Sequence, residues 1–326
     1  MLDLLTQPST ARPFPRVSER DARAAAGETL ARLRARRPRY GCGIRRGLGR
    51  RDASRCGGGL AGWALFLCLT FALSTAQAAD HLLLIGGLGG EEKYSKEFHE
   101  TLTTIRSLLT EKHGRPAANA RLLTDSETTT RGVNAVSTLE NVAREFERLR
   151  ADMRTSDTLL LILVGHGQSD FQEPKFSLPG RDLTASALGR MLDALPAQDQ
   201  RLILAFPCSG HFSQILAHPL RTILASTDGP RQIHDCVMPR YLIEALKTDA
   251  ADTDRDGAVS FYELFEFLSQ EVEGHFVGGD MLQTENPSLE DNGDGEVTTL
   301  AEGMDAGDGE NAKRIRFMPA SGKPGI

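Results

Sequence analysis

The chain has 326 residues, of which 40% are hydrophobic, and it carries a formal net charge of −6. The charge is uneven: residues 1–78 contain 14 Arg, no Lys and 5 acidic residues, a net of +9, so the remainder carries −15. So acidic a body argues against nucleic acid as a partner, because phosphate binding needs a basic face. The hydrophobic content is sufficient for one large core or two modest ones.

The basic N-terminal segment, residues 1–78, is typical of an export signal. Arginines up to Arg55 precede the apolar run LAGWALFLCLTFAL, and Ala76-Gln77-Ala78 follows it. A basic region, an apolar region and an A-x-A site together describe a secretory signal peptide. We therefore expect cleavage after Ala78 and an exported protein, periplasmic or extracellular. The apolar run is short for a membrane span of about 20 residues, so we expect no stable span after cleavage.

After the leader, apolar runs alternate with amphipathic stretches across residues 79–250. Short apolar runs predict strands at HLLLIGG, ARLLTD, TLLLILVGHG, RLILAFPCSG and RTILAST. Apolar residues at helical spacing predict helices over residues 91–113, 136–153, 184–195 and 239–247. Strands that alternate with helices favour an α/β fold, in which helices cover both faces of a mostly parallel central sheet.

Two chemically capable side chains follow two of the buried strands. His166 comes directly after TLLLILVG, and Cys208 comes directly after RLILAFP. Working groups of parallel sheets sit at the carboxyl ends of the strands, and neighbouring strands lie about 5 Å apart. A thiol needs such a neighbour, because only the thiolate is a good nucleophile. The pattern predicts a cysteine hydrolase in which Cys208 is the nucleophile and His166 acts as general base and then as general acid.

The backbone around this pair suggests further roles. Glycines flank His166 on both sides, which allows a sharp turn and a close approach to substrate. The N–H groups of Gly167 and Cys208 are candidates for an oxyanion hole. A turn histidine or a small buried thiol is common by itself. Their occurrence at successive strand ends is what favours a catalytic role.

The two cysteines after the leader, Cys208 and Cys236, leave two other interpretations open. In an oxidising compartment they are expected to form a structural disulfide. With His211 and His234 they also offer two thiolates and two imidazoles, enough for tetrahedral zinc. The spacing of His234 and Cys236 is poor for a zinc knuckle, and zinc leaves the apolar strand before Cys208 unexplained.

Several segments carry a resemblance to a known family. GHGQSDFQEPKFSLPGRDLTASALGRMLDALPAQDQRLILAFPCSG resembles bacterial relatives of the legumain (asparaginyl endopeptidase) family in the caspase–haemoglobinase clan. ILAST, RYLIEALKTDAADTDRDGAVS and NPSLEDNGDG extend the likeness over about residues 81–300. The resemblance implies a caspase-like α/β/α sandwich and a His166/Cys208 dyad that acts on a peptide or protein substrate.

The resemblance also implies a specificity pocket. The chain departs from the legumain pattern at two points near the nucleophile. In this clan the pocket is usually built around the strand after the cysteine, which here ends in Ser226, Thr227 and Asp228. An acidic Asp228 would favour a basic or amide side chain. Legumains usually have Glu-Ala before the nucleophile, where this chain has Phe-Pro. They also have two residues between Cys and Gly, where Cys208-Ser209-Gly210 has one, nearer the caspase pattern.

The stretch DTDRDGAVSFYELFEFL matches a calcium-binding loop. Positions 1, 3, 5, 6, 9 and 12 of the loop are filled by Asp252, Asp254, Asp256, Gly257, Ser260 and Glu263. The carbonyl of Ala258 can supply position 7, and Glu263 at the start of the next helix can bind bidentately. The sequence therefore predicts an EF-hand-like loop and helix over residues 251–272. Extracellular calcium modules have Kd values on the order of 10⁻⁴–10⁻³ M, which favours a structural Ca²⁺.

The last segment, residues 273–326, is rich in Gly, Asp and Glu and is predicted as mainly loop, with KRIRF as a candidate edge strand. Its turn EDNGDG begins like a second calcium loop, but Ala301 stands where the terminal Glu is needed. Two functions remain in contention. The first is a secreted cysteine endopeptidase stabilised by calcium. The alternative is a catalytically inactive calcium-binding scaffold with the same fold.

Overall fold

A mostly parallel sheet organises the computed structural model, which describes residues 78–126, 132–300 and 308–319. The sheet strands are β1 (Asp80–Gly86), β2 (Ala120–Thr124), β3 (Ala135–Val136), β4 (Thr158–Val164), β8 (Asp199–Ala205), β9 (Arg221–Ala225), β11 (Ser288–Glu290) and β12 (Thr298–Thr299). Their order is β12-β11-β9-β8-β4-β1-β2-β3. Only β11 runs against its neighbours, β9 and β12, within this sheet.

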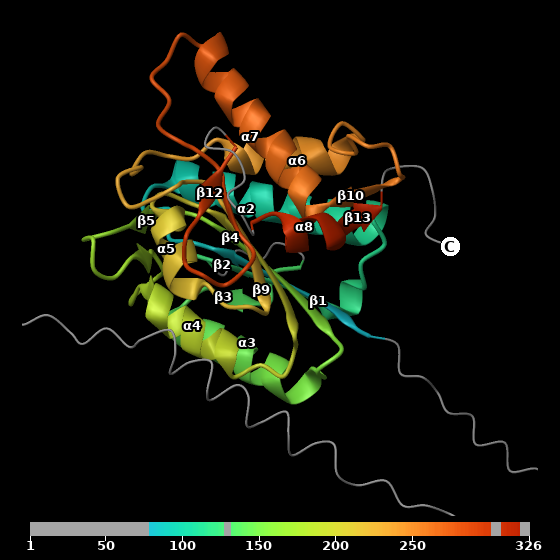
Figure 1. Cartoon of the computed structure of the whole chain (residues 1–326). Helices are drawn as coiled ribbons and strands as arrows, with labels where there is room; N and C mark the ends of the chain where they lie inside the picture. Colours follow the sequence, from blue (N-terminus) through green and yellow to red (C-terminus); the bar gives the residue numbers. More distant parts are fainter. Residues whose placement is uncertain (1–77, 127–131, 301–307, 320–326) are drawn as a thin grey trace, which may run out of the picture. The chain divides into compact units, whose positions relative to one another are not determined.

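Helices cover both faces of the sheet (Figure 1). They are α2 (Glu92–Ser107), which a π-helical turn (Leu108–Lys112) continues, α3 (Leu139–Asp152), α4 (Ala185–Asp193), α5 (Ser209–Leu216), α6 (Met238–Lys247), α7 (Phe261–Gly278) and α8 (Glu310–Arg314). The predicted α/β fold with a mostly parallel central sheet is thereby confirmed. The predicted leader, residues 1–78, lies outside the described residues except for Ala78.

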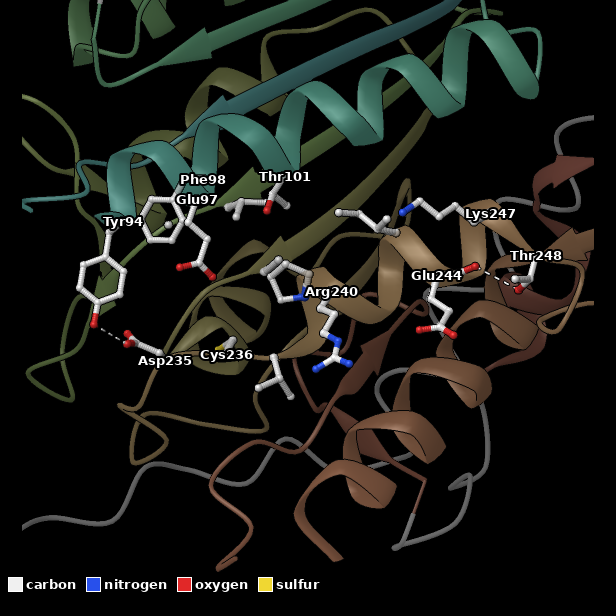
Figure 2. A pocket seen from close by; sticks show the side chains of 16 residues that line it. Tyr94, Glu97, Phe98, Thr101, Asp235, Cys236, Arg240, Glu244, Lys247 and Thr248 are labelled. Carbon is white, nitrogen blue, oxygen red and sulfur yellow. Dashed lines mark hydrogen bonds between the residues drawn. The ribbon is translucent and has the colours of Figure 1, made fainter. Parts of the chain in front are cut away.

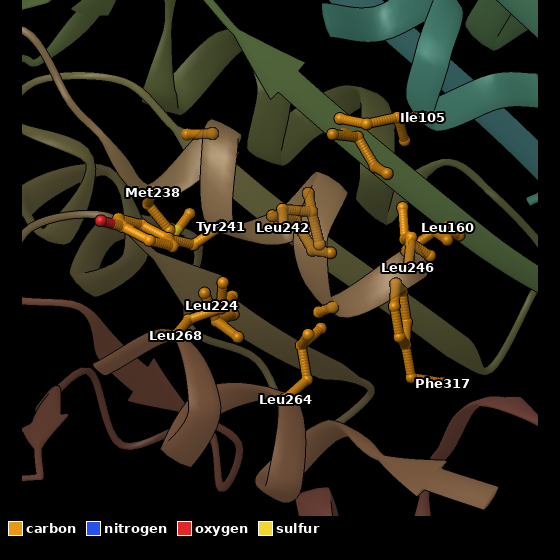
Figure 3. Close-up of a cluster of buried hydrophobic side chains, with 14 of the residues drawn as sticks. Ile105, Leu160, Leu224, Met238, Tyr241, Leu242, Leu246, Leu264, Leu268 and Phe317 are labelled. Atoms are coloured by element: carbon orange, nitrogen blue, oxygen red, sulfur yellow. The ribbon is translucent and has the colours of Figure 1, made fainter. Parts of the chain in front are cut away.

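Alternating side chains of each central strand enter two separate cores. In β4, Leu159, Leu161 and Leu163 pack with α3, α4 and α5. Leu160, Ile162 and Val164 of the same strand pack with α2, α6 and α7. Figure 3 shows part of this second core, where Leu242 and Leu246 of α6 meet Leu264 and Leu268 of α7. A strand buried on both faces has no polar position, which is why it reads as a continuous apolar run.

Smaller elements surround the sheet. The polar excursion after His166 forms a three-stranded antiparallel sheet of β5 (Gly167–Gln168), β6 (Lys175–Phe176) and β7 (Leu183–Thr184). β10 (Ala258–Ser260) pairs antiparallel with β13 (Arg316–Pro319). β13 overlaps the end of the strand predicted at KRIRF, whose first two residues instead end α8. Residues 273–326 differ from the expected loop, because β11 and β12 extend the central sheet.

Candidate functional site

The loops that carry His166 and Cys208 leave the same edge of the sheet in direct contact. β4 and β8 are parallel neighbours, with Val164 opposite Ala205. A Cβ built at Gly167 would lie closer than 3.0 Å to the carbonyl oxygen of Pro207, a separation that real Cβ atoms do not show. Gly167 is thus required for close backbone packing between the two loops.

Cys208 occupies a sharp turn between a strand and a helix. It lies between β8 and α5, acts as the N-cap residue of α5, and adopts the left-handed conformation with φ 61° and ψ 15°. Few non-glycine residues adopt this conformation, and such outliers cluster at functional sites. Gly210 follows, and a Cβ there would clash with the backbone of Thr227 and Asp228. The nucleophiles of α/β-hydrolases are presented on strand-to-helix turns.

The thiol of Cys208 is covered in this structure. The residue is 1% exposed, its Sγ donates to the Pro230 carbonyl oxygen at 3.5 Å, and its backbone N–H donates to the Gln232 carbonyl oxygen at 2.9 Å. Burial raises the pKa of the Cys208 thiol above its usual value, against a backbone hydrogen bond from Ser169 that favours the thiolate. The predicted oxyanion role of the Cys208 N–H requires its bond to Gln232 to be exchanged for one to substrate.

His166 is held by residues distant in sequence. Its Nδ1 lies 3.5 Å from Oδ1 of Asp235. Its ring stands edge-on to the rings of Tyr94 and Phe98, with centroid distances of 4.9 and 5.1 Å. The hydroxyl of Tyr94 donates to Oδ2 of the same Asp235 at 3.1 Å (Figure 2). Within the described ranges, no hydrogen bond joins His166 to Cys208.

Sequence reasoning missed this support for His166. Tyr94 and Phe98 belong to α2, and the loop before α6 supplies Asp235. An aromatic pair on an amphipathic helix reads as ordinary core, and a single Asp in a polar loop carries no pattern. Only the folded chain brings these three side chains to the histidine.

A cavity of about 730 Å³ opens beside His166, between α2 and α6 (Figure 2). The strand ends contribute Val164, Gly165 and Ala205 to its floor. Its other lining residues are Tyr94, Glu97, Phe98, Thr101, Asp235, Cys236, Val237, Pro239, Arg240, Ile243, Glu244, Lys247 and Thr248. The volume falls in the range of ligand sites, and the lining combines apolar walls with a few charged groups, as such sites do.

The residues predicted for the specificity pocket have other partners. Ser226 and Thr227 are fully buried. The Thr227 hydroxyl accepts from the Gly210 N–H at 2.9 Å, and its carbonyl oxygen accepts from Ser288 at 2.7 Å. Asp228 accepts from the Asn286 amide at 2.9 Å. None of the three predicted residues lines the cavity. These polar groups join neighbouring loops, and their role in a specificity pocket stays a prediction.

The alternatives for the cysteines do not match the structure. Cys208 and Cys236 are both free. Cys236 lines the cavity, and burial raises the pKa of its thiol well above the usual value. Nδ1 of His211 is hydrogen-bonded to the Ser169 hydroxyl at 2.8 Å. Over the ranges that the structure describes, these cysteines and histidines form no metal-ready group.

The predicted calcium loop does bring acidic ligands together. Carboxylate oxygens of Asp252, Asp254 and Asp256 lie within 4.8 Å of one another, a group that could hold a metal ion. The loop turns at Gly257, where φ is 88°, and it connects α6 to α7. Oδ1 of Asp252 is buried without a hydrogen-bond partner. An unpartnered buried carboxylate oxygen fits a cation ligand, because leaving such an atom unpaired is costly.

Glu263 does not join this acidic group. Its Oε2 accepts from the backbone N–H and the hydroxyl of Ser260, both at 2.8 Å, and its Oε1 accepts from the Thr253 N–H at 3.0 Å. With Ser260 it forms a capping box at the start of α7. The predicted bidentate role of Glu263 therefore requires its carboxylate to leave these donors.

A scan against protein-family models finds no match, and no curated protein is significantly similar to the chain. Among the described helices, none is both long enough and apolar enough to cross a bilayer. The interpretation of the site therefore depends on its own geometry and on the sequence.

The contact between the two loops makes Gly167 sensitive to substitution. We expect Gly167→Ala to lower the free energy of unfolding by about 1–3 kcal/mol, because the added methyl must displace the Pro207 backbone. Gly274→Ala is the control, since a Cβ there meets no atom within 4 Å. Urea unfolding of both variants checks the expectation, and equal stabilities would contradict it.

Proposed function

We propose that the chain is a cysteine endopeptidase with a caspase-like fold, related to the legumain family. The observation that carries the proposal is the strained Cys208 at the strand-to-helix turn, in a loop that contacts the loop of His166. Holding a buried cysteine in a sparsely populated backbone conformation costs free energy. A catalytic role would explain why the chain keeps a cysteine in this conformation.

The proposed mechanism uses the two side chains in sequence. With Nδ1 turned toward Asp235, His166 takes the thiol proton on Nε2 as Cys208 attacks the peptide carbonyl. The same proton then passes to the leaving amine, which departs and leaves a thioester. Water hydrolyses the thioester with His166 as base, and the thiol is restored. The Gly167 N–H, with that of Cys208 once released from Gln232, faces the oxyanion.

Catalysis requires the segment over Cys208 to open. Residues 230–232 lie against Cys208: the Pro230 carbonyl oxygen accepts from its thiol, and the Gln232 carbonyl oxygen accepts from its backbone N–H. Their displacement frees the thiol, gives substrate access and lets His166 approach. The cavity between α2 and α6 then receives a substrate side chain. Its lining offers Glu97, Asp235 and Glu244 to a cationic group and Arg240 and Lys247 to an anionic one.

The covered thiol favours a second candidate, a non-catalytic scaffold with the same fold. Cys208 is 1% exposed and its pKa is raised by burial, both of which suit a structural cysteine. In this case the cavity serves to bind a protein or peptide without cleaving it. The two candidates share the fold, the export and the calcium loop, and they differ in chemistry at Cys208.

A peptide-library cleavage assay separates the two candidates. We expect the wild-type chain to cleave peptides and Cys208→Ala to be inactive. Cys236→Ser should keep most of the activity, because Cys236 lines the cavity without a role in the proposed chemistry. An electrophile that labels Cys208 supplies a second readout. Cleavage by Cys208→Ala, or no cleavage by the wild type under any condition, favours the scaffold.

We also propose export of the chain and structural Ca²⁺ at the Asp252 loop. Calcium is expected to raise thermal stability, by about 2.7 kcal/mol at a hundredfold excess over Kd. The double variant Asp254→Asn/Asp256→Asn should lose much of this gain at little cost without the ion, since both side chains are exposed. The exposed Asp280→Asn is the control. Melts in calcium and in chelator that coincide for the wild type would refute the site.

A further inference from the structure

Two buried carboxyl groups near the C-terminal end of the chain each have an oxygen without a partner. Glu290, which is 0% exposed, accepts the Gly293 N–H at 2.6 Å on Oε1, while Oε2 has no hydrogen-bond partner. Asp308, which is 6% exposed, accepts the Thr298 hydroxyl on Oδ2, while Oδ1 has none. Buried carboxylate oxygens without a donor are costly and call for a ligand.

The fold brings these two groups into one acidic turn. Glu290 ends β11, and Thr298 of β12 pairs with Leu289 directly before it. Asp291, also buried, accepts the N–H groups of Gly309 and Ala312 at 3.0 and 2.7 Å, which places the start of α8 against the turn. Asp291, Asp294 and Asp308 all lie within electrostatic range of Glu290.

No basic side chain neutralises this turn. Among the described residues, no Lys or Arg forms an ion pair with Glu290, Asp291, Asp294 or Asp308; the ion pairs lie elsewhere. Arg221 is within electrostatic range of Glu290, but its guanidinium donates to Gln200, Leu216 and Asp193. A buried acidic cluster in this state must either retain protons or bind a cation.

Protonation alone would leave the lone pairs of both free oxygens unused. Burial raises the pKa of Glu290 to about 7 and also raises the pKa of Asp308. A bound cation satisfies the oxygens directly and removes the repulsion between the carboxylates. Donors that are all oxygen favour a hard cation such as Ca²⁺ over zinc or copper.

We propose that Glu290 and Asp308 hold a second Ca²⁺, with Asp294 closing the site from the solvent side. Asp294 is exposed, and no three ligand atoms in this part of the described structure lie within 4.8 Å of one another. Binding therefore draws Asp294 inward, and water completes the six to eight oxygens that calcium needs. The missing terminal Glu of this turn is replaced by Asp308, which arrives from beyond β12.

A cation bound here would stabilise the loops around the cavity. β11 and the residues before it fasten those loops: Ser288 donates to the Thr227 carbonyl oxygen at 2.7 Å, and Asn286 donates to Asp228 at 2.9 Å. Glu285 accepts the N–H groups of Val237 and Met238 at 2.5 and 3.0 Å. An ion on Glu290 holds this strand at its far end. The proposal stands whether or not the chain is a peptidase.

Calcium binding to the full chain tests the proposal by stoichiometry. Equilibrium dialysis and titration calorimetry with CaCl₂ should find two ions on the wild type. Glu290→Gln/Asp308→Asn should bind one, and Asp254→Asn/Asp256→Asn should also bind one. The combined variant should bind none. Mg²⁺ at equal concentration should bind at least tenfold more weakly than Ca²⁺. Mg²⁺ requires a smaller, near-ideal octahedral arrangement of ligands, which one exposed and two buried carboxylates do not supply.

Two outcomes overturn the proposal. One is a folded Glu290→Gln/Asp308→Asn variant that binds as many ions as the wild type. The other is an Asp254→Asn/Asp256→Asn variant that binds no ion. This second variant leaves the buried turn unchanged, so its result does not depend on whether the first variant folds. Loss at the Asp252 loop alone would leave this site intact, so the two calcium proposals fail separately. Circular dichroism verifies that each variant is folded.

Discussion

Replacing His166 and Cys208 together is expected to slow peptide cleavage no more than replacing either alone. Each single variant, His166→Ala or Cys208→Ala, should lose about 10³-fold or more in kcat/KM, because members of one catalytic unit act jointly and their losses do not add. The basis is the contact between their loops at the ends of β4 and β8. The measurement is kcat/KM for the three variants on the best library peptide. Losses that multiply would mean that the residues act independently.

Asp235→Asn provides a graded comparison for that experiment. Asp235 is exposed and lies 3.5 Å from His166, so its attraction should contribute up to about 1 kcal/mol, or about fivefold in rate. A loss as large as that of His166→Ala would indicate a more direct role for this carboxylate.

Stability is expected to fall as the pH rises from about 4.5 to about 7, because of Glu285. This carboxyl is 1% exposed, and burial raises its pKa from 4.5 to about 7, against the backbone N–H groups of Val237 and Met238. The folded state thus binds the proton more tightly than the unfolded state. The stabilisation is complete below the unfolded pKa and is lost as pH rises through the folded pKa. The difference corresponds to about 3 kcal/mol.

Glu285→Gln isolates this contribution. The variant keeps a neutral side chain of the same shape at every pH, so its unfolding free energy should fall less over this range than that of the wild type. The fall that remains comes from Glu290, whose pKa burial also raises to about 7. Urea unfolding of wild type and variant from pH 4.5 to 8, in chelator, gives the comparison. The exposed Glu273→Gln is the control and should follow the wild type. Parallel curves for the wild type and Glu285→Gln would contradict the expectation.

The central strands and their flanking helices were predictable because burial on both faces leaves a strong pattern. β4 is apolar after its first residue, β8 is apolar over residues 202–205, and α2 and α3 show one apolar face each. The predicted placement of His166 and Cys208 after neighbouring strands follows from the same pattern. Parallel pairing of these strands then brings the two loops together.

Other parts of the site depend on contacts that leave no local pattern. α5 begins directly after the strained Cys208 and spans only eight residues, and β11 and β12 have three and two residues. Their existence depends on tertiary pairing. The cover over Cys208 comes from backbone carbonyl groups of an irregular loop, to which residue type contributes little. The capping role of Glu263 could not be predicted from the sequence, because a Glu at that position is expected in both a calcium loop and a capping box.

The left-handed backbone conformation of Cys208 reverses the usual order of stability of a glycine variant and an alanine variant. At ordinary helix or strand positions a glycine variant is less stable than an alanine variant by about 0.5–1 kcal/mol. At φ 61° every residue with a Cβ bears a steric penalty of about 1 kcal/mol or more, which glycine avoids. Cys208→Gly should therefore be at least as stable as Cys208→Ala.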